Sequence, residues 1–117
     1  MPVLPRLAEN RAGFALDYPG FGRSEGRLEA EAATAPALAR FVLRTAEALG
    51  VQGPFAFLVD HDPGGAVARH VAVSAEGRVS KLALVNSVLY DSWPVPALEQ
   101  FRHDPEYARN ITPDEPI

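Results

Sequence analysis

The chain has 117 residues, of which 47% are hydrophobic and 22% charged, so its length and composition fit one small globular domain. Its net charge of −4 gives no basic footprint for nucleic acid. It has no cysteine, no apolar run long enough to cross a membrane and no signal-peptide pattern, which excludes disulfide, thiolate and membrane-spanning roles. We therefore expect a soluble, cytoplasmic protein without nucleic-acid or membrane partners.

The first predicted element is a short strand over residues 12–17 (AGFALD), followed by a glycine-containing loop over residues 18–26. A helix is predicted for residues 35–49, because apolar side chains recur at helical spacing along one face. Thr34 is expected to cap this helix, and Gly50 fits its end.

Two more strands flank a second helix. Residues 54–60 (PFAFLVD) are apolar almost without alternation, as expected of a parallel strand that is covered on both faces. A helix over residues 64–75 and a strand over residues 81–87 follow. This order is typical of the α/β class, with about three mostly parallel strands and flanking helices. We divide the chain into a core over residues 1–88 and a proline-rich, polar segment over residues 89–117.

The polar corner between the second strand and the second helix is the strongest candidate for chemistry. Ligands of α/β proteins bind beyond the carboxyl ends of the strands, where Asp62 lies. A tight turn there can lift one side chain above the sheet, and Gly64 and Gly65 are small enough to let the backbones pack. A carboxylate in this place can form an ester with an electrophilic carbon. The local pattern alone fits an aspartate that caps the next helix at least as well.

Two other chemistries find less support at this corner and in the first loop. Asp60, His61 and Asp62 carry metal-binding atoms, but successive strand residues point to opposite faces, so three in a row rarely converge. We predict no metal site. The sequence DYPGFGRS (17–24) is similar to one loop of GTPases, but the only lysine, Lys81, follows no phosphate-binding loop.

Four segments together resemble the α/β-hydrolase superfamily, in the branch with an aspartate nucleophile elbow that includes haloalkane dehalogenases and epoxide hydrolases. The segments, in the family's order, are DYPGFGRSEG, VDHDPGGAVA, RVSKLALVNS and YDSWPVP. The resemblance implies that Asp62 is the nucleophile, that the substrate is a small organic molecule and that no cofactor is used. It also implies that Tyr90 and Trp93, at the entry to a cap region, line the substrate pocket, although plain packing explains these two residues equally well.

The corner departs from the family pattern at two positions. Asp60 stands where the family has a glycine, which places a second carboxylate near the first. Pro63 follows the nucleophile, where the family uses a backbone N–H to bind the oxyanion, and proline has no N–H. Losing one such donor typically lowers the rate about 100- to 1000-fold.

The resemblance further implies a partial hydrolase core, because the family's oxyanion loop and its later catalytic acid and histidine have no counterpart in the sequence. In the family, the strand that carries the oxyanion loop lies between those matching residues 12–17 and 54–60. These two strands must therefore pair directly or leave open edges. Two hypotheses result: a hydrolase that is weak or inactive alone, and a non-catalytic remnant or interaction module that forms homo-oligomers through its sheet edges.

Overall fold

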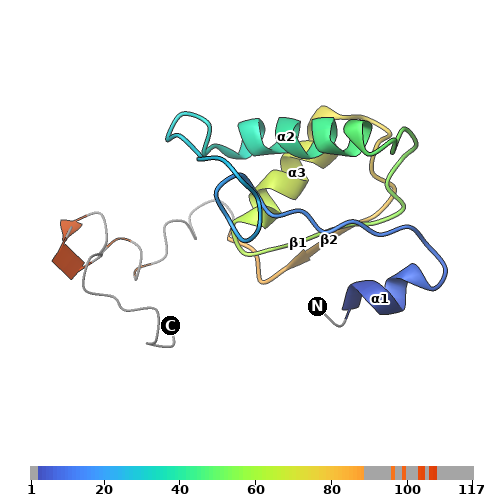
Figure 1. Cartoon of the computed structure of the whole chain (residues 1–117), viewed down its shortest axis with the longest axis horizontal. Coiled ribbons are helices and arrows are strands. Elements are labelled where there is room, and N and C mark those ends of the chain that lie inside the picture. Colours follow the sequence, from blue (N-terminus) through green and yellow to red (C-terminus); the bar gives the residue numbers. More distant parts are fainter. Residues whose placement is uncertain (1–2, 89–95, 97–98, 100–102, 105, 108–117) are drawn as a thin grey trace.

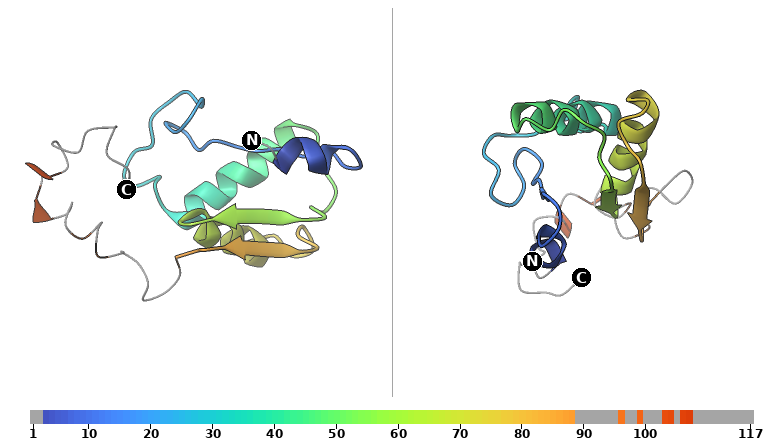
Figure 2. Two further views of the ribbon diagram at one scale, coloured as in Figure 1. Left: turned by 90° about the horizontal axis from the view of Figure 1, so that it is seen from below. Right: turned by 90° about the vertical axis from the view of Figure 1, so that its right-hand side faces the viewer.

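The computed structural model describes residues 3–88, 96, 99, 103–104 and 106–107 (Figure 1). Its helices and strands, in chain order, are α1 (Val3–Ala8), α2 (Ala35–Ala48), β1 (Leu58–His61), α3 (Gly64–Ser74) and β2 (Leu82–Val85). The two strands form a parallel sheet, and α2 and α3 both lie on one side of it (Figures 1 and 2). The predicted α/β class is therefore confirmed. None of the helices in the described ranges is long and apolar enough to cross a membrane.

Helix α3 connects the two parallel strands and is the centre of the packing. It contacts β1, β2 and α2, whereas α1 packs against none of the other elements. The strands pair from Leu58 with Leu82 to His61 with Val85, and a separate parallel bridge joins Phe55 to Val79. The predicted strand over residues 54–60 is thus a single bridge followed by a short strand.

The end of α2 shows why its predicted boundary is nearly correct. Gly50 has a φ of +76°, which residues with a side chain rarely adopt. Its N–H donates to the Glu47 carbonyl at 2.9 Å, and the Val51 N–H donates to the Ala46 carbonyl at 2.8 Å. These two bonds form a Schellman motif, which satisfies carbonyls that the end of the helix leaves free. At the other end Thr34 is the N-cap residue, as predicted, but its hydroxyl makes no capping hydrogen bond.

The strand predicted over residues 12–17 is not formed, because these residues pair with no strand in the described part of the chain. In both views of Figure 2 this segment runs beside β1, on the side away from β2. The residues on either side of the segment contact that region through their side chains: the Arg11 guanidinium stacks on Phe57, and the Tyr18 hydroxyl donates to Asp60. The described sheet consequently has two strands, and β1 has one open edge.

The core is small and lies between α2 and α3. Ala39 of α2 packs with Val67 and Val71 of α3, and these three side chains are at most 3% exposed. The opposite face of the sheet is open, with Val59 58% exposed and Val85 51% exposed. The prediction that the second strand is covered on both faces is therefore wrong for the described residues, because both packed helices lie on the same face.

We expect Val71→Ala to lower the free energy of unfolding by about 2 kcal/mol, because it removes two methyl groups from a fully buried site. The matched control is Val73→Ala, in the same helix but 80% exposed, which should change stability by less than about 0.5 kcal/mol. Urea denaturation of both variants tests the expectation. Equal losses in the two variants would show that α3 does not pack as described.

Candidate active site

The connection between β1 and α3 is a turn of only two residues, Asp62 and Pro63. Asp62 has a φ of +53°, in the left-handed region that residues with a side chain seldom occupy. Its N–H donates to the Val85 carbonyl at 3.4 Å, and its carbonyl accepts the Gly65 N–H at 3.0 Å. These bonds hold the backbone in its strained conformation, and the side chain at the apex is exposed. A strained strand-to-helix turn with an exposed side chain is the geometry of a nucleophile elbow.

The alternative role of Asp62, capping α3, finds no support in the geometry. The N-cap of α3 is Pro63, one residue later, and the cap has no side-chain hydrogen bond. The Asp62 carboxylate makes no hydrogen bond to any described residue. Its oxygens are therefore available to a substrate.

The two glycines at the start of α3 are required by close approach, as the sequence predicts. Both are buried. A Cβ atom on Gly64 would collide with the Asp60 carboxylate, and one on Gly65 would collide with the side chain of Ser87. Larger residues at either position would push α3 away from the ends of the two strands.

Asp60 is half-buried beneath the corner and has two hydrogen-bond donors. The Tyr18 hydroxyl donates to its Oδ2 at 3.3 Å, and the backbone N–H of His61 donates to its Oδ1 at 2.9 Å. Burial of the phenol, together with the charge and the hydrogen bond of Asp60, raises the pKa of Tyr18, so this hydroxyl stays a donor. Sequence reasoning missed Tyr18, because a tyrosine in a glycine-rich loop carries no pattern that identifies its partner.

The three polar side chains of the corner have different surroundings. Asp60 is directed into the corner, whereas His61 and Asp62 are exposed. Within the described ranges, no group of three potential ligands is close enough to hold a metal ion.

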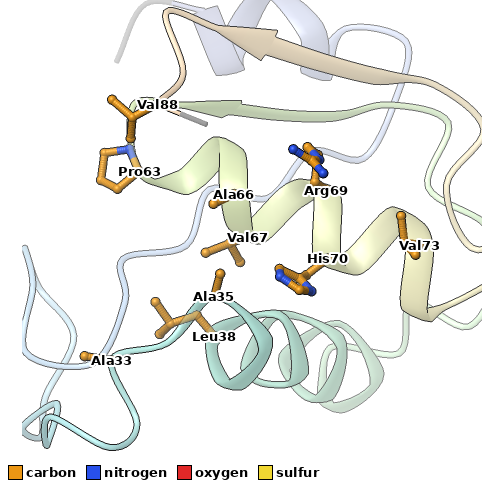
Figure 3. A pocket seen from close by; sticks show the side chains of 10 residues that line it. All are labelled: Ala33, Ala35, Leu38, Pro63, Ala66, Val67, Arg69, His70, Val73 and Val88. Carbon is orange, nitrogen blue, oxygen red and sulfur yellow. The ribbon is translucent and has the colours of Figure 1, made fainter. Parts of the chain in front are cut away.

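An open groove of about 520 Å³ lies beside the elbow, between α2 and α3 (Figure 3). Most of its lining is apolar, with Arg69 and His70 as the polar exceptions. Pro63 and Val88, which follow the carboxyl ends of β1 and β2, line one end of the groove, whereas Asp62 is not among the lining residues. The predicted substrate-binding residues Tyr90 and Trp93 lie outside the described residues.

Comparison with known proteins shows which family the sequence matches and which relative it resembles. The family model for the alpha/beta hydrolase fold matches residues 1–114. The chain is also similar to the dihydrolipoyllysine-residue acetyltransferase component of the acetoin cleaving system of Cupriavidus necator, with 40% identity over 85 residues. That match covers 73% of this chain and 22% of the relative, so the chain spans about a fifth of the relative's length. No solved structure matches the chain.

The strain at the elbow predicts an order of stability for two substitutions. Asp62→Gly should be more stable than Asp62→Ala by about 1 kcal/mol, because only glycine adopts a left-handed conformation without cost. The same pair at Glu47, exposed within α2, should show the reverse order, since glycine destabilises helices relative to alanine by about 1 kcal/mol. Chemical denaturation measures both. An alanine variant at position 62 that matches the glycine variant would contradict the left-handed turn.

Proposed function

Because the chain belongs to the α/β-hydrolase fold family, we propose that Asp62 is the nucleophile of an aspartate-type elbow that attacks an electrophilic carbon in a small organic substrate. The proposal rests on the backbone conformation of Asp62 and on the exposure and hydrogen bonding of its side chain. Asp62 has a φ of +53°, its side chain is exposed, and its carboxylate has no hydrogen-bond partner among the described residues. A residue with a strained backbone conformation, whose side chain makes no structural hydrogen bond, is a candidate for a functional role.

The first step of this chemistry is displacement at carbon. An Asp62 oxygen forms a bond to the substrate carbon while the carbon–halogen bond breaks and the halide leaves with the electron pair. With an epoxide, the ring C–O bond breaks instead and the alkoxide takes a proton from water. Neither reaction passes through a tetrahedral oxyanion, so the missing N–H of Pro63 does not hinder this step.

The second step, hydrolysis of the ester, depends on oxyanion stabilisation. Water adds to the ester carbonyl and generates a tetrahedral oxyanion, which the family stabilises with the N–H of the residue after the nucleophile. That residue is Pro63, which has no N–H. Loss of one donor costs about 100- to 1000-fold in rate. The ester on Asp62 is therefore expected to form faster than it is cleaved, and turnover by this chain to be weak.

Acyl transfer is a second chemistry to weigh, because the relative from Cupriavidus necator is named as an acetyltransferase component. Attack on an acyl group generates a tetrahedral oxyanion in its first step. Pro63 therefore slows the first step of acyl transfer, whereas in alkyl displacement it slows only the later cleavage of the ester. This difference favours an alkyl halide or epoxide over an acyl donor as the substrate.

A non-catalytic role is the second candidate function, and the open sheet favours it. Among the described residues β1 has a strand neighbour on one side only, and Phe57, Val59 and Val85 expose apolar side chains. Unpaired apolar strands promote association between chains. This candidate predicts oligomers that depend on concentration, together with an Asp62 that stays unmodified by electrophiles.

Intact-mass spectrometry after incubation with alkyl bromides, alkyl iodides and epoxides separates the two candidates. We expect one covalent adduct per chain, which peptide mapping assigns to Asp62. Asp62→Asn should remove the adduct, because an amide is a poor nucleophile at carbon, whereas Glu76→Gln, at an exposed carboxylate beyond α3, should retain it. An unmodified mass across the whole panel, or an adduct that persists in Asp62→Asn, would refute the nucleophile assignment.

A further inference from the structure

Asn86, at the end of β2, lies next to Asp62, at the end of β1. The two strands are parallel and pair up to His61 with Val85, so Asp62 and Asn86 are the residues that follow the last pair. The Asp62 N–H donates to the Val85 carbonyl at 3.4 Å, which ties the two strand ends together. Because neighbouring strands are about 4.8 Å apart, the two side chains start from adjacent positions at the carboxyl edge of the sheet.

These two neighbours share a strained backbone conformation. Asn86 has a φ of +46° and Asp62 a φ of +53°, and in the described part of the chain no other residue with a side chain has a positive φ. Asparagine is tolerated in this conformation when its short side chain forms a local hydrogen bond. The Asn86 side chain is exposed and forms no hydrogen bond with any described residue. Local structure therefore gives no reason for an asparagine here, and strained residues are known to cluster at active sites.

The Asn86 carboxamide has hydrogen-bond donors, which the Asp62 carboxylate lacks. An ionised carboxylate only accepts hydrogen bonds, whereas a carboxamide is uncharged and carries two N–H donors. An amide is a poor nucleophile at carbon, so Asn86 does not compete with Asp62 in the attack. Its N–H groups are instead suited to a substrate atom on which negative charge develops during the reaction.

Building on the proposed role of Asp62 as the nucleophile, we propose that Asn86 is a substrate-binding residue whose carboxamide donates a hydrogen bond to the oxygen of an epoxide. An Asp62 oxygen forms a bond to one ring carbon, the C–O bond at that carbon breaks, and its electron pair moves to the ring oxygen. The oxygen stays attached to the neighbouring carbon, so it remains in the site as an alkoxide until water protonates it. The Asn86 N–H stabilises the charge that develops on this oxygen.

This hydrogen bond favours an epoxide over an alkyl bromide as the substrate. The charge on an alkoxide is concentrated on one strongly basic oxygen, so the alkoxide gains more from an N–H donor than a bromide ion does. Bromide is also a good leaving group, which departs from carbon without such assistance. We therefore expect epoxides to be the preferred electrophiles of Asp62.

The rates of adduct formation on Asp62 with butylene oxide and with butyl bromide, followed by intact-mass spectrometry, test this role of Asn86. In Asn86→Gly the epoxide rate should fall at least about tenfold relative to the bromide rate, because one hydrogen bond to a charged group is lost. Glycine adopts the left-handed conformation without strain, so this variant should fold. Asn10→Gly, which removes an exposed carboxamide after α1, is the matched control and should leave both rates unchanged.

A second variant removes the donors and keeps the shape of the side chain. Aspartate also tolerates a positive φ, so Asn86→Asp should fold, and it should lower the epoxide rate relative to the bromide rate at least as much as Asn86→Gly does. If circular dichroism shows that Asn86→Gly does not fold, Asn86→Asp decides alone. Adducts that still form on Asp62 with an unchanged ratio of the two rates would overturn the role of Asn86 and leave the nucleophile in place. An unaltered chain that forms no adduct with either compound would refute the nucleophile, and the role of Asn86 with it.

Discussion

The close approach of α3 to the ends of the two strands is the constraint on which the rest of the structure depends. The turn between β1 and α3 has two residues, and the next two, Gly64 and Gly65, lie against Asp60 and Ser87 with no room for a Cβ atom. This contact fixes where α3 crosses the sheet. The position of Val67 and Val71 against α2 follows from it, and so does the left-handed backbone of Asp62. One short turn therefore sets both the core and the exposed carboxylate.

The sequence predicts those features whose causes are local. Helix α2 follows from its apolar periodicity and from Gly50, and the helix after the elbow follows from the Pro-Gly-Gly corner. Residues 12–17 have the composition of a strand, but a strand exists only where a neighbour supplies backbone partners, and no described segment does so. The exposed face of β1 is not predictable either, because an apolar sequence does not reveal that both packed helices lie on the same face of the sheet.

In the candidate site, too, the locally caused features are predictable from the sequence and the long-range contacts are not. The tight turn at Asp62 and the two glycines after it are predictable, because a particular backbone geometry requires particular residue types. The bond from Tyr18 to Asp60 is not, since it joins two residues 42 positions apart whose distance only the fold determines. Asp60 is a departure from the family pattern in the sequence, and in the structure it is a hydrogen-bonded group in a space that Gly64 provides. The roles of Tyr90 and Trp93 stay predictions, since both lie outside the described residues.

The central claim is that Asp62 can form an ester which Pro63 makes slow to cleave. Time-resolved intact-mass measurement on Pro63→Ala tests it most directly, because alanine restores the backbone N–H of the residue after Asp62, the proposed nucleophile. The account predicts that the ester forms at an unchanged rate and that its lifetime falls about 100-fold. An ester that never forms, or whose lifetime is the same with proline and with alanine, would contradict the account.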